Sequence, residues 1–175
     1  PTAAAISYGF QPDSEDVQTI LVYDFGDESF EATLITASGN QFIESGNAGD
    51  LWLDIDQVEY QMIEYVKEQV AQEEDLDSVD ALLSAMPHYQ RLRFSGDLKV
   101  AVERAKIDLS RFETAQIIPS NPLLDELGMA ISVDVEMTRQ QFESMILPMV
   151  ERTINIARDA LKYSDWDEED VDVIL

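Results

Sequence analysis

The sequence predicts a layered α/β fold, because helices occur between strands and the strands are both paired and isolated along the chain. Three segments have the β-branched and aromatic composition typical of strands, at residues 20–24, 30–36 and 41–45. They are followed by apolar residues at helical spacing, namely Ile55, Val58, Met62, Val66 and Val70. Residues 173–175 form another apolar strand candidate after a long helix, so we expect this last strand to run parallel to an earlier one.

The first half of the chain predicts a helix, a meander of strands and a second helix. Residues 1–10 are rich in alanine and predict a short helix ending near Gly9, followed by a polar turn at 11–16. Ser38-Gly39-Asn40 supplies a turn between the second and third strands, which favours an antiparallel meander. Residues 46–52 predict a loop. Residues 53–71 predict a helix with its apolar stripe toward the core and four charged residues toward water, Glu59, Glu64, Lys67 and Glu68.

The second half predicts two long helices separated by strands. Residues 79–86 predict a short helix that Pro87 ends, and a long helix is expected from residue 89 or 95 to 111, with Gly96 weakening its first turns. Strands are expected at 113–119 and 129–136. Thr138 and Gln141 have the spacing of a capping box, which opens a third helix that Pro148 either kinks or restarts. Residues 164–170 predict an acidic turn or short helix.

Composition excludes several classes of function. The chain has 36 acidic and 11 basic residues, and its net charge is −25. So few basic side chains cannot neutralise a run of phosphates, so we expect no nucleic-acid partner and no anionic membrane partner. The absence of cysteine excludes disulfides and thiolate metal sites and fits a reducing compartment, so we expect a cytoplasmic protein. The chain begins at Pro1 and stops on an apolar strand, so we expect a piece of a longer protein.

The strongest candidate for chemistry is the stretch around Asp24. An apolar strand ends at this aspartate, a short turn follows, and a second strand begins at Phe30. A carboxylate at the mouth of such a hairpin can hold a metal or a water beside a phosphate, while amides of the turn cradle the phosphate oxygens. From the residues alone, an aspartate that simply caps the turn is an equal alternative.

Two motifs around this stretch carry a resemblance to a known family. P-T-A-A-A at residues 1–5, followed by D-F-G-D-E-S-F at 24–30, resembles the second phosphate loop of the DnaK-type (seventy-kilodalton heat-shock) chaperone ATPases. That family reads P-T-A-A-A and then D-L-G-G-G-T-F. Residues 103–110, E-R-A-K-I-D-L-S, resemble its helical motif E-x-A-K-x-x-L-S, and V-D-V-I-L at the end resembles its D-D-V-I-L.

The resemblance implies a fold and a division of the chain. It implies the actin-like, ribonuclease H-like fold of the heat-shock chaperone ATPases, an α/β fold with a mixed sheet, flanking helices and a smaller α+β subdomain. Residues 1–55 and 136–175 would form the inner subdomain of one lobe. Residues 56–135 would form the smaller, outer subdomain.

The same resemblance implies a nucleotide site for ATP or ADP with Mg²⁺. Asp24 would be the catalytic residue that faces the metal and the attacking water beside the γ-phosphate. Four loop residues would line the phosphates and three helical residues would contact adenine and ribose: Gly26, Asp27, Glu28 and Ser29, then Glu103, Lys106 and Ser110. The last three share a helix face by spacing, and their alternative interpretation is an ordinary surface pair between Glu103 and Lys106.

Asp27 and Glu28 depart from the family pattern because they replace glycines. Glutamate lacks the tolerance of glycine for left-handed backbone. A carboxylate about 4 Å from a phosphate charge costs about 4 kcal/mol at an effective dielectric of 20, which weakens binding about a thousandfold. Either carboxylate offsets this cost if it becomes a ligand of Mg²⁺. The loop therefore predicts weak or absent ATP binding. Residues 48–53 resemble the family's N-G-D-T-H-L, but Asp54-Ile55-Asp56-Gln57 replaces G-G-E-D, so no site is assigned there.

Three functions remain open. The first is one lobe of the ATPase domain of a DnaK-like chaperone, which binds ATP or ADP in a cleft with the other lobe and drives protein folding cycles. Its partners would be a nucleotide-exchange factor and a co-chaperone, and the lone lobe is predicted not to hydrolyse ATP. The second is a degenerate, non-hydrolysing domain retained as an acidic protein-interaction module. The third is another actin-like ATPase.

Overall fold

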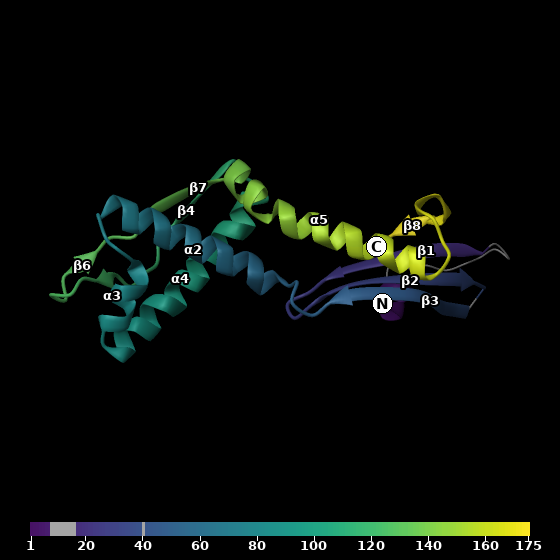
Figure 1. Ribbon diagram of the computed structural model, residues 1–175, viewed down its shortest axis with the longest axis horizontal. Helices are drawn as coiled ribbons and strands as arrows, with labels where there is room; N and C mark the ends of the chain where they lie inside the picture. The colour runs from purple at the N-terminus through teal and green to yellow at the C-terminus, as the bar shows by residue number, and fades with distance from the viewer. Residues whose placement is uncertain (8–16, 40) are drawn as a thin grey trace. The chain divides into compact units, whose positions relative to one another are not determined.

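The chain forms two compact units, which we describe separately. The computed structural model describes residues 1–7, 17–39 and 41–175 (Figure 1). The first unit comprises Pro1–Asp56 and Leu147–Leu175, and the second comprises Gln57–Ile146. The predicted end of the first helix near Gly9 and the polar turn at 11–16 lie outside the described residues. Among the residues described, no helix combines the length and apolar character needed to span a lipid bilayer.

A mixed four-stranded sheet forms the centre of the first unit. Its strands are β1 (Gln18–Phe25), β2 (Phe30–Ser38), β3 (Gln41–Asp50) and β8 (Val173–Ile174), in the order β3-β2-β1-β8. The first three form the predicted antiparallel meander. The last strand pairs with β1 in parallel, as predicted. The predicted fold class, a mixed sheet with flanking helices, is therefore confirmed.

The third strand is longer than predicted. Residues 46–50 continue β3, so the predicted loop at 46–52 is wrong over most of its length. Its glycines serve close packing: a Cβ atom on Gly49 would lie 2.9 Å from the carbonyl oxygen of Phe30, and one on Gly46 would lie 3.1 Å from that of Ala160. The pairing with β2 also shifts beside Leu34, which creates an irregularity that an alternating pattern does not reveal.

Helices cover both faces of this sheet. Ala5 of α1 (Thr2–Ser7) packs into an apolar cluster with Ile20, Val22, Ile35 and Ala37 on one face. On the other face lies α5 (Arg139–Tyr163), where the hydroxyls of Tyr23 and Thr153 share a hydrogen bond (Figure 1). This helix continues through Pro148, so the alternative in which a new helix starts there is wrong.

The second unit combines helices with two short β-ribbons. It contains most of α2 (Ile55–Glu73), all of α3 (Val79–Ala85) and α4 (His88–Leu109), and the strands β4 (Thr114–Ile117), β5 (Leu123–Leu124), β6 (Ala130–Ile131) and β7 (Val135–Thr138). The predicted strand at 129–136 is wrong as a single element, because β6 pairs with β5 whereas β7 pairs with β4. β5 was not predicted.

The starts of the helices agree well with what the sequence predicts. Thr138 and Gln141 form the predicted capping box: the amide of Thr138 donates to Gln141 Oε1 at 2.8 Å, and the amide of Gln141 donates to Thr138 Oγ1 at 3.1 Å. α4 starts at His88 directly after Pro87, so Gly96 does not delay it. The acidic segment before the last strand contains a short 3₁₀-helix, η1 (Glu168–Asp170), one of the two predicted alternatives.

Candidate functional site: an acidic hairpin and a lysine-bearing helix

The hairpin between β1 and β2 has a closed backbone. Phe25 pairs with Phe30, which leaves residues 26–29 as the turn. The amide of Gly26 donates to the carbonyl of Ser29 at 3.0 Å, and the carbonyl of Gly26 accepts from the amide of Ile55, at the start of α2, at 3.2 Å. Both main-chain groups of this glycine are therefore engaged within the protein, and its amide is not directed at a ligand in this conformation.

The turn does not require glycine where the family motif has it. Among the described residues other than glycine, only Asp75 and Asp165 have positive φ angles. The predicted backbone conflict at Glu28 is therefore wrong, because Asp27 and Glu28 occupy the turn without left-handed geometry. Their charge, not their backbone, is what distinguishes this loop.

The side chains of the hairpin gather around one small pocket. It has a volume of about 330 Å³ and is lined by Asp24, the four turn residues 26–29, and Glu31. The structure thus brings together all the loop residues that the sequence nominated. Sequence reasoning missed Glu31, although the hairpin register puts it directly opposite Asp24, and paired residues share a face of the sheet.

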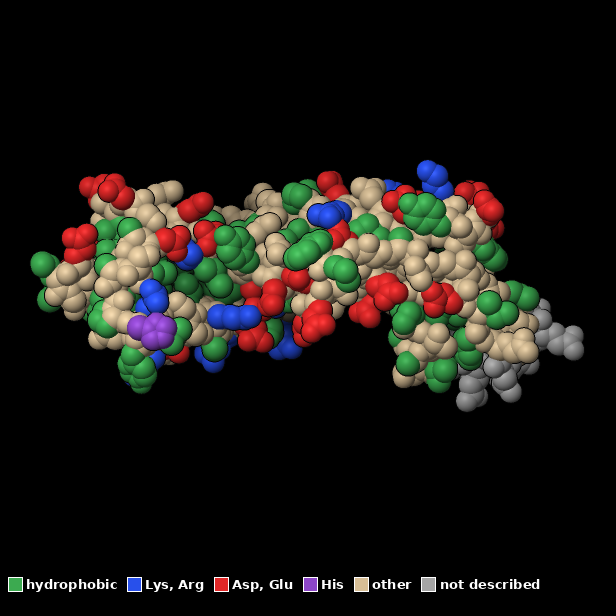
Figure 2. All heavy atoms as spheres, turned by 60° about the horizontal axis from the view of Figure 1, so that its bottom comes forward, with side chains coloured by type: hydrophobic (Ala, Val, Ile, Leu, Met, Phe, Trp, Pro, Cys, Tyr) green, Lys and Arg blue, Asp and Glu red, His purple; other side chains and the backbone are tan. Residues whose placement is uncertain are grey.

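The pocket is strongly acidic because of where it lies on the sheet. One face of β1 carries Ile20, Val22 and Asp24, because alternate residues of a strand lie on the same side of the sheet. The first two belong to the buried apolar cluster, whereas Asp24 lies at the hairpin end of the strand, among the other carboxylates. Four carboxylates line the pocket, from Asp24, Asp27, Glu28 and Glu31, and no basic side chain of the described residues does. Figure 2 shows the same imbalance on a larger scale, with acidic side chains outnumbering basic ones on the face in view.

This donor set suits a hard cation better than a bare anion. Mg²⁺ prefers oxygen ligands, retains several waters, and is usually held by one or two carboxylates together with substrate phosphates. Within the part of the chain that the structure describes, no group of three or more acidic or histidine side chains has the arrangement of a metal site. The carboxylates of the pocket therefore fit Mg²⁺ that arrives with a phosphate ligand, rather than a metal cage made by the protein alone.

The second nominated group lies on α4 in the second unit. Glu103 and Ser110 are exposed and Lys106 is half-buried. Lys106 contacts α2 rather than Glu103: its Nζ atom lies 2.6 Å from Oε1 of Glu59. The alternative of a surface pair between Glu103 and Lys106 is therefore wrong. The hydroxyl of Ser110, the residue directly after α4, donates to the carbonyl of Ile107 at 2.6 Å.

Glu59 differs most from its prediction. It was expected to face water, yet it is only 7% exposed. Lys106 and Lys99 approach its two carboxylate oxygens from α4, so the charge that the helical pattern assigned to the surface is compensated inside the unit. Nothing in the periodicity of α2 indicates this, because the partners lie 40 and 47 residues further along the chain.

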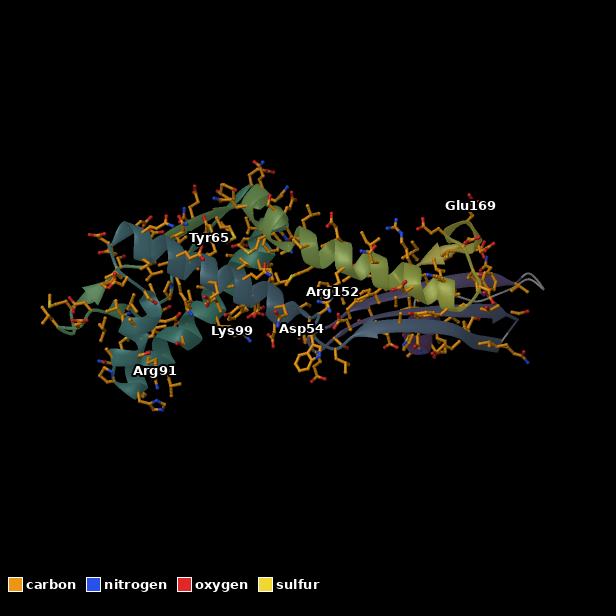
Figure 3. All side chains as sticks on the ribbon, in the orientation of Figure 1. Asp54, Tyr65, Arg91, Lys99, Arg152 and Glu169 are labelled. Atoms are coloured by element: carbon orange, nitrogen blue, oxygen red, sulfur yellow. The ribbon has the colours of Figure 1, made fainter. Side chains whose placement is uncertain are left out.

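Asp50, which ends β3, has a structural role. Its side chain is 11% exposed and forms an ion pair with Arg152 of α5, which is labelled in Figure 3. Its other oxygen accepts from the amide of Trp52 at 2.9 Å. This aspartate therefore shapes the connection between β3 and α2.

Comparison with known proteins places these observations in a family. The family model for the Hsp70 protein matches residues 1–175. The chain is 30% identical to the chaperone protein DnaK of Metamycoplasma hominis over 176 residues, and 30% identical to that of Mycoplasmopsis pulmonis (strain UAB CTIP) over 177 residues. Each alignment covers 100% of this chain but only 28% and 27% of those two proteins. The chain therefore belongs to the Hsp70 family.

Proposed function

We propose that this chain is one lobe of the nucleotide-binding domain of a DnaK-like chaperone, and that it binds ATP or ADP with Mg²⁺ in a cleft shared with a second lobe. The observation that carries the proposal is the single pocket in which Asp24 and residues 26–29 meet. Membership of the Hsp70 family supports a chaperone nucleotide-binding domain in general. The division into lobes and the chemistry are our inference.

Three residues of the hairpin have a chemical role in this proposal, namely Asp24, Ser29 and Glu31. The carboxylate of Asp24 is exposed at the end of β1, where it can accept a hydrogen bond from the attacking water and face the metal. The hydroxyl of Ser29 donates to a phosphate oxygen. When bound, Mg²⁺ neutralises part of the phosphate charge. Glu31, opposite Asp24, would supply a second carboxylate to hold the metal.

The second unit supplies the nucleoside contacts. We assign Glu103 and Lys106 of α4, and Ser110 directly after it, to adenine and ribose, because their spacing puts them on one helix face. In this assignment the first unit is the inner part of the lobe and the second unit is the outer subdomain, which a nucleotide-exchange factor would contact. A co-chaperone partner and a cytoplasmic location belong to the same proposal.

The charge of the pocket makes nucleotide binding weak and dependent on Mg²⁺. Four carboxylates repel the phosphate oxygens unless a cation lies between them. This same observation favours a second candidate function, the non-hydrolysing acidic interaction module. The two functions differ in whether Asp24 supports hydrolysis.

Single-turnover hydrolysis of ATP by the full-length protein separates the two candidates. Asp24→Asn should lower the hydrolysis rate at least about tenfold, because it removes the carboxylate that orients water, and each 1.36 kcal/mol of barrier is a factor of ten. Asp134→Asn, an exposed site in the second unit, is the matched control and should leave the rate unchanged. The 175-residue chain alone should show no hydrolysis. Equal rates for wild type and Asp24→Asn would favour the interaction module.

A further inference from the structure

We infer that Glu59 is a positioning residue that holds the ammonium group of Lys106 in place for the nucleoside; this inference rests on the proposed nucleotide-binding role of α4. Glu59 lies on α2 and is almost fully buried. One carboxylate oxygen is 2.6 Å from Lys106 Nζ, and the other is 3.7 Å from Lys99 Nζ. Lys99 is labelled on α4 in Figure 3.

A carboxylate at this place needs an explanation beyond packing. Taking a charge out of water is costly, and apolar side chains of similar size usually stabilise a core at least as well. Both helices already bury apolar residues on either side of the pair, including Val58 and Met62 of α2 and Val102 of α4. The ion pair is therefore not needed to bury either helix, whereas it fixes the position of one lysine.

Lys106 is suited to contact a ligand once it is fixed in this way. An ammonium group has three hydrogen-bond donors, and Glu59 uses one of them. The lysine side chain is 22% exposed, so it reaches the surface of the unit, where Glu103 and Ser110 lie on the same helix face. A long side chain that is already ordered loses less conformational entropy when it binds hydroxyl or ring-nitrogen acceptors of a nucleoside.

The charges of the cluster also depend on Glu59. With the carboxylate, the three side chains carry a net charge of +1. Without it, two ammonium groups remain two helical turns apart on the same face of α4 and repel each other. Loss of the Glu59 charge should therefore move Lys106 out of position, not only remove one contact.

A double-mutant cycle on the full-length protein tests this inference, with Mg-ADP affinity as the readout. Glu59→Gln and Lys106→Met should each raise the Kd about tenfold, and the double variant should resemble Lys106→Met alone, because contacting residues couple non-additively. Lys99→Gln is the control, since it keeps the shorter contact and should change the Kd less than about twofold. An unchanged Kd in Glu59→Gln, or additive effects in the double variant, would overturn the inference.

A second measurement does not depend on nucleotide binding or on a variant. In wild-type protein, NMR should detect a scalar coupling across the hydrogen bond between Lys106 Nζ and the Glu59 carboxyl carbon. A freely rotating, uncoupled ammonium group would refute positioning by Glu59. If wild-type protein binds no nucleotide but this coupling is present, the proposed function fails while the positioning of Lys106 stands.

Discussion

The main-chain carbonyl of Gly26 accepts a hydrogen bond from the amide of Ile55, the first residue of α2. This contact ties the acidic turn to the start of a helix, whose first amides have no partner within the helix itself. The turn is therefore held by main-chain bonds on both sides of Gly26. Substitution of the side chains of Asp27 and Glu28 removes none of these main-chain bonds. The charge of the turn can therefore be changed without changing its backbone.

Two glycines should respond in opposite ways to replacement by alanine. Gly49→Ala should lower stability by about 1–3 kcal/mol, because the new Cβ atom would lie 2.9 Å from the carbonyl oxygen of Phe30. Gly96→Ala should raise stability by about 0.5–1 kcal/mol, because no atom lies within 4 Å of the new Cβ in the middle of α4. Native-state hydrogen exchange, read separately for each unit, measures both effects. Equal effects of the same sign would contradict the packing described for β3.

Two aspartates that follow the ends of helices have left-handed backbone, and their replacement by glycine should raise the stability of the protein. Asp75 and Asp165 have φ angles of 52° and 55° after α2 and α5. In each case the amide of the next residue donates a hydrogen bond to a carbonyl of the helix, as in a Schellman motif. The amide of Leu76 donates to the carbonyl of Ala71 at 2.9 Å, and the amide of Trp166 donates to that of Leu161 at 3.1 Å.

Replacement of either aspartate by glycine should raise stability by about 0.5–1 kcal/mol, because glycine adopts this conformation without strain and removes a negative charge from a helix C-terminus. Replacement by alanine removes the same charge but should still lower stability, since alanine adopts left-handed backbone less readily than aspartate does. Hydrogen exchange of the last helical turn gives the measurement. A gain with alanine as large as that with glycine would show that charge alone, and not the φ angle, governs these sites.

The sequence predicts the elements of this fold better than their contacts. The strands β1 and β2 and the capping box at Thr138 follow from local pattern, and the parallel direction of the final strand follows from the long helix before it. The end of β3 does not follow from local pattern, because glycines are typical of turns, and the close approach of α5 to Gly46 and of β2 to Gly49 is not visible in the local sequence. The burial of Glu59 is not predictable from α2 alone either, because its two lysine partners lie on α4.

The candidate site shows the same division. The motif around Asp24 nominates five pocket residues without structural information, because they are neighbours in sequence. Glu31 requires the register of the hairpin, and the partner of Lys106 requires two helices to be placed side by side. Both depend on contacts between segments that no local pattern encodes.

We propose that the hairpin binds nucleotide through Mg²⁺ and that the charges of Asp27 and Glu28 limit its affinity. Calorimetric titration of the full-length protein with Mg-ATP tests this most directly, with wild type compared to Asp27→Asn/Glu28→Gln and to Asp27→Gly/Glu28→Gly. We expect weak binding by wild type and a gain of at least about tenfold in both double variants, equal in size because the turn needs no glycine. A wild-type Kd in the micromolar range or tighter that neither double variant improves would contradict the account.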